Sequence, residues 1–258
     1  MSISQNIINF MPMKNGLMRI GEYFLMMKKV LTRPVKYSMF YKQLRIELSK
    51  IGLDSLAIVI VISVFIGAVV AIQQYLNIED PLLPRYLIGL VARDALILEF
   101  SPTLVGLILA GKVGSSIASE IGTMRVTEQI DALEIMGINA ASFLILPKII
   151  AAIFFFPILI ILSIGIGIFG AWMGGNSVGL LTSDFLLGLR YEFIPFYLTY
   201  CIVKTIFFAF IITSVSAYFG YSTKGGAINV GSSSTKAVVY SSMLILIFNF
   251  ILTDLLLA

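Results

Sequence analysis

The sequence predicts an all-α integral membrane protein, and three observations support this fold class. Of its 258 residues, 59% are hydrophobic and 12% are charged, whereas roughly 25% are charged in an average soluble domain. The mean hydropathy is +0.99. Uncharged stretches long enough to cross a bilayer recur along the chain. A soluble domain of this size could not bury so many apolar side chains, so the composition excludes soluble enzymes and soluble binding modules.

The gaps between charged residues predict five transmembrane helices, because a helix needs about 20 mostly apolar residues to cross a hydrocarbon layer roughly 30 Å thick. The second predicted span begins near Tyr86. It carries Arg93, Asp94 and Glu99 within the membrane, because the uncharged run that follows them is too short to cross it. Lys204 lies inside the fourth span. The other four predicted spans are residues 56–75, 149–172, 193–218 and 237–256.

The distribution of lysine and arginine predicts the orientation of these spans. Residues 14–50 carry nine of them, and with this end inside, the inner segments hold fourteen while the outer loops hold only Arg85 and Arg190. Cytoplasmic loops carry the excess of positive charge. We therefore expect the N-terminus in the cytoplasm and the C-terminus on the outer side.

The basic N-terminal region, residues 1–54, is predicted to form helices that lie in the inner membrane interface, ahead of a membrane domain over residues 55–258. Residues 17–31 mix apolar side chains with scattered lysine and arginine. A second stretch places four apolar residues on one helical face: Tyr41, Leu44, Leu48 and Ile51. The alternative is an ordinary positively charged flank of the first span.

The loop between the second and third spans, about residues 112–147, has the pattern of a short amphipathic helix. Three apolar residues recur at helical spacing: Ile130, Leu133 and Met136. An acidic stripe runs beside them: Glu128, Asp131 and Glu134. A solvated charged face is the usual explanation for such a stripe. Acidic residues are scarce in this chain, however, and four of the fourteen lie between residues 120 and 134.

Thr127 is expected to cap the start of this helix and Gly137 its end, which gives about ten residues on the cytoplasmic side. An isolated helix of that length is only marginally stable in water. We therefore expect it to pack against another element or another protein.

Three stretches resemble one family of membrane proteins. Residues 110–139, AGKVGSSIASEIGTMRVTEQIDALEIMGIN, closely resemble the signature loop of the MlaE-type permeases, which are membrane subunits of ABC transporters that move lipids with MCE-domain partners. Residues 225–242, GGAINVGSSSTKAVVYSS, are similar to a second block of that family, and residues 99–102, EFSP, to a third. The five predicted spans agree with the family as well.

The resemblance implies a permease subunit of an ATP-driven transporter that moves lipid, with phospholipid as the expected class, between the membranes of a Gram-negative-type envelope. ATP and Mg²⁺ would be bound by a partner ATPase, and an MCE-domain protein would bind on the outer side. It places this chain in the inner (cytoplasmic) membrane with a periplasmic C-terminus. A homodimer is expected, because one chain offers only one coupling helix to a pair of ATPase subunits.

The resemblance also implies that the short inner helix is a coupling helix, whose acidic stripe meets basic residues of the ATPase. The residues expected to take part in this coupling are Glu120, Gly122, Thr123, Arg125, Thr127, Glu128, Gln129, Asp131 and Glu134.

Charged residues inside the spans are candidates for a lipid path, because an ionisable group at bilayer depth costs about 2.5–3.5 kcal/mol and needs a partner or a wet cavity. Glu99 and Lys204 lie at similar depth and can interact. Their pair either fixes the helix register or lines a cavity for a lipid headgroup. The family often places arginine before this glutamate, where this chain has Leu98. The remaining candidates are Arg93 and Asp94 as a polar wall, and Val69 and Gln73 beside an acyl-chain slot.

Several other functions are excluded or weakened by what the chain contains. It has no histidine and one cysteine, which excludes histidine-based catalysis and an internal disulfide. Gly226 and Gly231 have the spacing of a P-loop but lack its lysine, so we expect no ATPase and no cofactor in this chain, and an inner turn rich in glycine and serine. Nucleic acid is not an expected partner.

Two other functional classes stay open beside the permease. One is an ion-coupled secondary carrier that uses Glu99 and Lys204, although no inverted repeat is evident. The other is a scaffold that recruits cytoplasmic proteins. Gly170 and Gly174 form a small-xxx-small pair, which predicts close helix packing either within the subunit or across a dimer.

Overall fold

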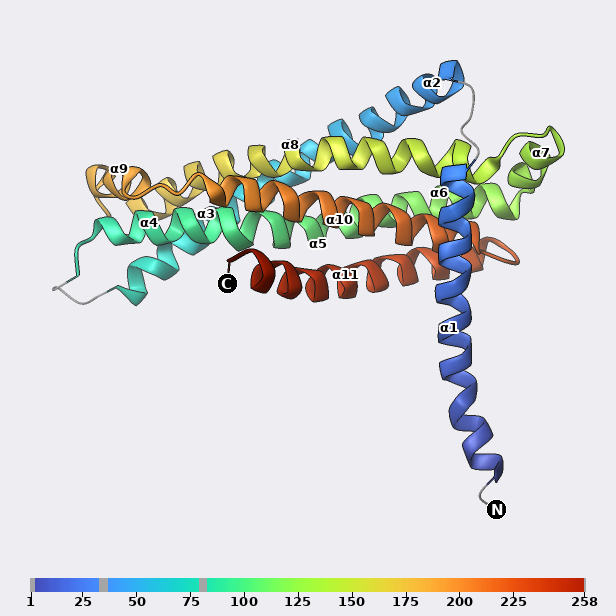
Figure 1. Ribbon diagram of the computed structural model, residues 1–258. Coiled ribbons are helices and arrows are strands. Elements are labelled where there is room, and N and C mark those ends of the chain that lie inside the picture. Colours follow the sequence, from blue (N-terminus) through green and yellow to red (C-terminus); the bar gives the residue numbers. More distant parts are fainter. Residues whose placement is uncertain (1–2, 33–36, 79–82, 258) are drawn as a thin grey trace.

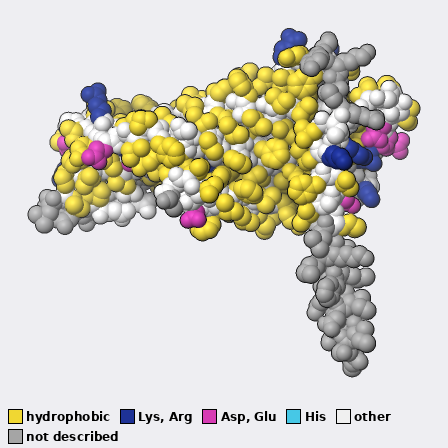
Figure 2. Space-filling model, in the orientation of Figure 1, with side chains coloured by type: hydrophobic (Ala, Val, Ile, Leu, Met, Phe, Trp, Pro, Cys, Tyr) yellow, Lys and Arg dark blue, Asp and Glu magenta, His cyan; other side chains and the backbone are white. Residues whose placement is uncertain are grey.

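The computed structural model describes residues 3–32, 37–78 and 83–257, and helices are the only regular elements in this part of the chain. Figure 1 shows an elongated bundle, and Figure 2 shows hydrophobic side chains over its middle with charged side chains gathered toward its ends. The all-helical class and the number of spans are confirmed. Five helices in the described residues are long and apolar enough to cross a membrane: Met39–Asn77, Tyr86–Val126, Ala140–Ser177, Phe196–Tyr221 and Ala227–Leu257.

The first long helix begins well before the predicted span. Helix α2 (Tyr37–Leu48) continues through a π-helical segment η1 (Ser49–Leu53) into α3 (Asp54–Asn77). The helix therefore runs without a break across residue 54, where the sequence analysis separates an interfacial region from the membrane domain. Helix α1 (Ile3–Thr32) crosses the bundle at a steep angle, near the end that carries α7 (Gln129–Ile135). We call this end the α7 end (Figure 1).

The second long helix begins at Tyr86, as predicted, and continues far beyond the expected loop boundary. It comprises α4 (Tyr86–Ala95), π-helical η2 (Leu96–Val105), α5 (Gly106–Leu109), π-helical η3 (Ala110–Gly114) and α6 (Ser115–Val126). The first half of the predicted coupling loop is therefore the last part of this helix. Pro102 lies inside η2 and has no backbone N–H to donate to the helix.

Helix α7 has seven residues instead of about ten, and the predicted N-cap is wrong. Thr127 ends α6, and its hydroxyl donates to the Thr123 carbonyl at 2.8 Å. The residue before α7 is Glu128, held at a φ of 60°. The predicted end is confirmed in kind, because Gly137, at a φ of 75°, lies just after the helix.

Of the last three long helices, α8 (Ala140–Ser177) and α11 (Ala227–Leu257) exceed their predicted spans, and α10 (Phe196–Tyr221) has the predicted length but lies three residues later in the chain. Helix α8 continues past residue 172. Helix α11 already includes Gly231 and the serines after it, so the expected inner turn is shorter and lies before residue 227. A short helix that the sequence analysis does not predict, α9 (Thr182–Arg190), packs on α4 at the opposite end of the bundle, which we call the α9 end.

The glycine pair in α8 packs within the subunit. Cβ atoms at Gly170 and Gly174 would collide with the backbones of Val64 and Ala68 on α3. The spacing of four residues on both helices keeps these contacts on one face. Because lipid gives helices little hydrophobic reason to associate, this close backbone approach supplies much of the contact between α3 and α8.

A buried ion pair joins α2 to α8 near the α7 end. The Lys148 ammonium lies 2.7 Å from a Glu47 carboxylate oxygen, and both side chains are at most 2% exposed. Lys148 also contacts Glu120 of α6 at 3.0 Å, and Glu120 contacts the more exposed Lys50 at 3.2 Å. Glu47 accepts a further hydrogen bond from Gln43 at 3.0 Å. Three helices are thus held together by one alternating chain of charges.

We expect Gly170→Ala to destabilise the protein by about 1–3 kcal/mol, because the added methyl group overpacks the α3–α8 contact. Gly165→Ala is the matched control, since a Cβ there meets nothing within 4 Å. Thermal unfolding of both variants in the same detergent measures the difference. Equal melting temperatures would contradict the packing described for Gly170.

We expect Lys148→Met to cost about 3–5 kcal/mol, because the change leaves the Glu47 carboxylate buried without its cation. The double variant Glu47→Gln/Lys148→Met removes both charges and should recover most of that loss. Denaturation of the two variants side by side checks this. A double variant as unstable as the single one would show that the helices need the ion pair itself.

Candidate functional site

Polar residues of three helices meet around Glu99 inside the apolar part of the bundle. Glu99 lies in η2, and one of its oxygens is 2.7 Å from the Lys204 ammonium of α10. The predicted interaction between these two residues is confirmed. Lys204 is completely buried, whereas the Glu99 side chain is 41% exposed in the single chain.

Each charge of this pair has further hydrogen-bonding partners. Lys204 donates to the Tyr200 hydroxyl at 2.7 Å and to the Leu98 carbonyl at 3.2 Å. On α11, the Asn249 amide donates to Glu99 at 3.1 Å and the Thr253 hydroxyl at 3.2 Å. Thr103, one turn after Glu99, donates to its second oxygen at 3.1 Å. We call these residues the Glu99 network.

The Glu99 network satisfies a charge pair that apolar surroundings would otherwise disfavour. Hydrogen bonds to both partners are what a buried ion pair needs to offset the loss of hydration. Lys204 has no exposed surface left for a ligand. Glu99 keeps part of its surface open beside α11, so it is the member of the pair that can meet a headgroup or another subunit.

Asn249 and Thr253 are site residues that the sequence analysis missed. They stand four residues apart in the mainly apolar second half of α11, which puts them on one face. This spacing of polar residues within a span was the available signal. The candidates around Glu99 within the spans were chosen by formal charge, so the uncharged Asn249 and Thr253 were not selected.

Arg93 and Asp94, which were predicted to extend a polar wall from Glu99, make their contacts elsewhere in the structure. The Arg93 guanidinium is buried and donates to the carbonyls of Leu189 and Tyr191 at 2.9 and 2.8 Å, just where α9 ends. Its Nε lies 2.8 Å from Asp94. Arg93 thus attaches the loop after α9 to α4 and does not line a cavity with Glu99.

Val69 and Gln73, the two candidates on α3, are exposed and lie one helical turn apart. Neither takes part in the Glu99 network. Their exposure on one face agrees with an apolar slot and equally with an ordinary lipid-facing helix.

The residues of the predicted acidic stripe on the coupling helix differ in their contacts. The Asp131 carboxylate lies 2.6 Å from the Arg125 guanidinium of α6, and Glu134 accepts a hydrogen bond from the Tyr221 hydroxyl of α10 at 2.9 Å. The Arg125 guanidinium also lies over the Tyr221 ring at 5.7 Å. These two carboxylates therefore attach α7 to the bundle, whereas the third residue of the stripe, Glu128, is exposed and forms no ion pair with any described residue.

The outward face of α7 combines exposed apolar residues with polar and charged ones. Of the apolar residues at helical spacing, Ile130 is fully buried beneath the helix and Met136 is 65% exposed, while Ile135 is 87% exposed. Glu128 and Ala132 are also exposed, at helical spacing from Ile135 and Met136. We call these four residues the α7 face.

The remaining coupling candidates surround α7 or lie behind it. Thr123, Thr127 and Gln129 are exposed, and the Gln129 amide donates to the Thr127 hydroxyl at 3.0 Å. Gly122 is buried where α6 approaches Thr223. Glu120 lies in the charge chain with Lys148, on the bundle side.

Comparison with known proteins agrees with this architecture. A family model described as Permease MlaE matches residues 45–255. A probable ABC transporter permease protein of Rickettsia bellii is 38% identical over 241 residues, which cover 92% of this chain and 91% of the relative. A probable ABC transporter permease protein of Synechocystis is 34% identical over 213 residues, covering 80% and 79%. The chloroplastic protein TRIGALACTOSYLDIACYLGLYCEROL 1 of Arabidopsis thaliana is 30% identical over 227 residues, covering 88% and 65%.

The family model covers most of the chain, and the match includes α7 and the five long helices apart from the first residues of the first helix and the last residues of the fifth. The expected membership of the MlaE family is thereby confirmed. The chain is a multi-pass membrane protein that belongs to the MlaE family of ABC transporter permeases.

Proposed function

We propose that this permease moves lipid across or out of the inner membrane of a Gram-negative-type envelope, driven by a cytoplasmic ATPase that binds the α7 face. Phospholipid is the expected substrate class. The observation that carries the proposal is the Glu99 network, a half-open carboxylate held at membrane depth in a chain of this family. One relative is named after a galactolipid, which favours a lipid over a small polar solute.

In this proposal the α7 end is cytoplasmic and the C-terminus is periplasmic, as the excess of lysine and arginine at that end suggests. The ATP and Mg²⁺ chemistry belongs to the ATPase subunit. An MCE-domain protein at the periplasmic end would receive or deliver the lipid.

We place the dimer contact along α11. This helix is the least buried of the five long helices in the single chain. Its exposed apolar residues include Val239, Met243, Leu246, Ile247, Phe250 and Ile251. A second copy of the chain covering this face would also enclose the open side of Glu99. Two such carboxylates would then border one cavity between the subunits.

An ion-coupled carrier remains the second candidate, because the Glu99–Lys204 pair is fully formed at membrane depth. The two functions differ in energy source. Uptake of lipid into vesicles that depends on ATP and not on an ion gradient supports the permease, and the reverse result supports the carrier.

Removing the charges of the Glu99 network should separate folding from transport. Lys204→Met alone leaves the carboxylate without its cation, so we expect poor accumulation in the membrane. Glu99→Gln/Lys204→Met should accumulate as the wild type does, yet move lipid at least tenfold more slowly in reconstituted vesicles with the ATPase. If the double variant transports at the wild-type rate, the pair serves only to fix the helix register.

Replacing the apolar residues of the α7 face by charged ones should weaken binding of the ATPase. We expect Ile135→Asp/Met136→Asp to reduce the copurified ATPase at least tenfold, which corresponds to about 1.4 kcal/mol, while the chain stays inserted. Leu181→Asp is the control, since Leu181 is an exposed apolar residue at the α9 end. Undiminished ATPase in the double variant would place the docking surface elsewhere.

A further inference from the structure

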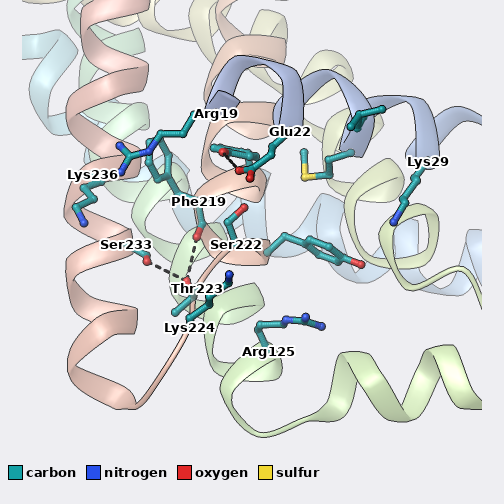
Figure 3. Close-up of a pocket in the computed structure, with 14 residues that line it drawn as sticks. Arg19, Glu22, Lys29, Arg125, Phe219, Ser222, Thr223, Lys224, Ser233 and Lys236 are labelled. Atoms are coloured by element: carbon teal, nitrogen blue, oxygen red, sulfur yellow. Dashed lines mark hydrogen bonds between the residues drawn. The ribbon is translucent and has the colours of Figure 1, made fainter. Parts of the chain in front are cut away.

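A basic pocket of about 530 Å³ lies at the α7 end, where α1 crosses α10 and α11. Figure 3 shows its side chains arriving from separate elements around one opening. Among the residues that line it, Glu22 is the one carboxylate. The basic residues that line it are Arg19 and Lys29 of α1, Arg125 of α6, Lys224 after α10 and Lys236 of α11.

Most of this positive charge has no anionic partner inside the protein. Arg125 is paired with Asp131, and the Glu22 carboxylate accepts a hydrogen bond from the Tyr218 hydroxyl at 3.0 Å. The other four cations of the pocket form no ion pair with any described residue. Cations gathered around one concave surface focus a positive potential that attracts anions.

An apolar groove of about 950 Å³ continues from this pocket. The two cavities share Arg19, Tyr218 and Phe219. The distance along α10 from Phe207 to Phe219, twelve residues later, corresponds to about 18 Å of helix. Half of the hydrocarbon layer is about 15 Å thick, so the groove has the length of one leaflet. Its apolar lining includes Ile20 and Phe24 of α1, Phe207 and Phe210 of α10, and Leu244 and Phe248 of α11.

Aromatic contacts fix α1 in the position that creates both cavities. The Tyr23 hydroxyl donates to the Ser214 hydroxyl at 2.9 Å, and the Tyr23 ring meets the Tyr218 ring edge to face at 5.9 Å. Phe219 stacks on Tyr240 of α11 with ring centroids 5.1 Å apart. The pocket and the groove therefore form one built surface that spans three helices.

We propose that this surface binds one anionic phospholipid of the leaflet at the α7 end, the cytoplasmic leaflet in the orientation proposed above. The phosphate lies against Arg19 and Lys236, which Figure 3 shows on one side of the pocket, and the acyl chains lie in the groove. The guanidinium binds phosphate oxygens in a bidentate way, and the ammonium adds a second charge. The lipid is a resident one that holds α1 on the bundle, since the site shares no residue with the Glu99 network.

Charge complementarity favours a lipid over the other possible occupants. A soluble phosphate would neutralise the cations of the pocket, but it has no apolar part to fill the groove. A second copy of the chain would bring the apolar face of α11, whose one carboxylate, Asp254, lies near the C-terminal end of the helix and cannot match four cations. An anionic phospholipid matches both parts at once.

Native mass spectrometry of the purified full chain, with its ATPase where it copurifies, tests the proposal. The probes are dioleoyl phosphatidylglycerol, dioleoyl phosphatidylcholine and glycerol phosphate. We expect Arg19→Gln/Lys236→Gln to bind phosphatidylglycerol at least tenfold more weakly than the wild type, and phosphatidylcholine to bind weakly to both. Lys28→Gln/Lys42→Gln, which removes two exposed lysines outside the pocket, should bind as the wild type does.

A second pair of variants tests the groove. Leu244→Trp fills it and should weaken phosphatidylglycerol binding at least fivefold, whereas Leu255→Trp, at an exposed position of the same helix outside both the groove and the proposed dimer contact, should not. Equal binding by the wild type and the charge variant would overturn the proposal. So would glycerol phosphate bound as tightly as the lipid, or a changed subunit number in the charge variant. Transport is not the readout, so failure of this proposal and failure of the proposed function can be told apart.

Discussion

The structure depends on one constraint, that a charge surrounded by hydrocarbon or apolar side chains must find its partner within the protein. Lys204 meets Glu99, Lys148 meets Glu47, and Arg93 meets the carbonyls at the end of α9. Each of these contacts joins helices that are distant in sequence. In a bundle without a strong hydrophobic drive between helices, such contacts and close glycine packing determine which helices are neighbours.

The same constraint separates structural charges from functional ones. A cation that is buried and fully paired, like Lys148, holds helices together. A charge that remains partly exposed, like Glu99 beside α11 or Arg19 in the basic pocket, can still bind a ligand or another protein. Exposure thus divides the few charged residues of this chain into those that build the bundle and those that meet lipid or another protein.

Much of the fold could be predicted from the sequence, because apolar length and charge asymmetry are local properties. The start of the second long helix at Tyr86 and the contact between Glu99 and Lys204 followed from counting residues. Helix ends were predicted less well: the serines after Gly231 and the glycines near the end of α8 are typical of turns, yet they lie in helices. Gly174 packs on the backbone of Ala68, and Ser233 and Ser234 form hydrogen bonds with Thr223 and the Ser115 carbonyl. The inward contacts of Asp131 and Glu134 depend on Arg125 and Tyr221, which no periodicity within residues 128–136 could reveal.

The continuous second long helix offers a physical link between the two ends of the molecule. Helix α7 is attached to α6 through Arg125 and Asp131, and α6 continues without a break into the segment that carries Glu99. From Arg125 to Glu99 the helix covers roughly 40 Å. Two π-helical segments interrupt its regular hydrogen bonding, and one of them, η2, contains both Pro102 and Glu99. π-helical turns are frequent at functional sites. A force applied to the α7 face would therefore be carried by a rigid rod and absorbed where the rod is least regular, beside the carboxylate.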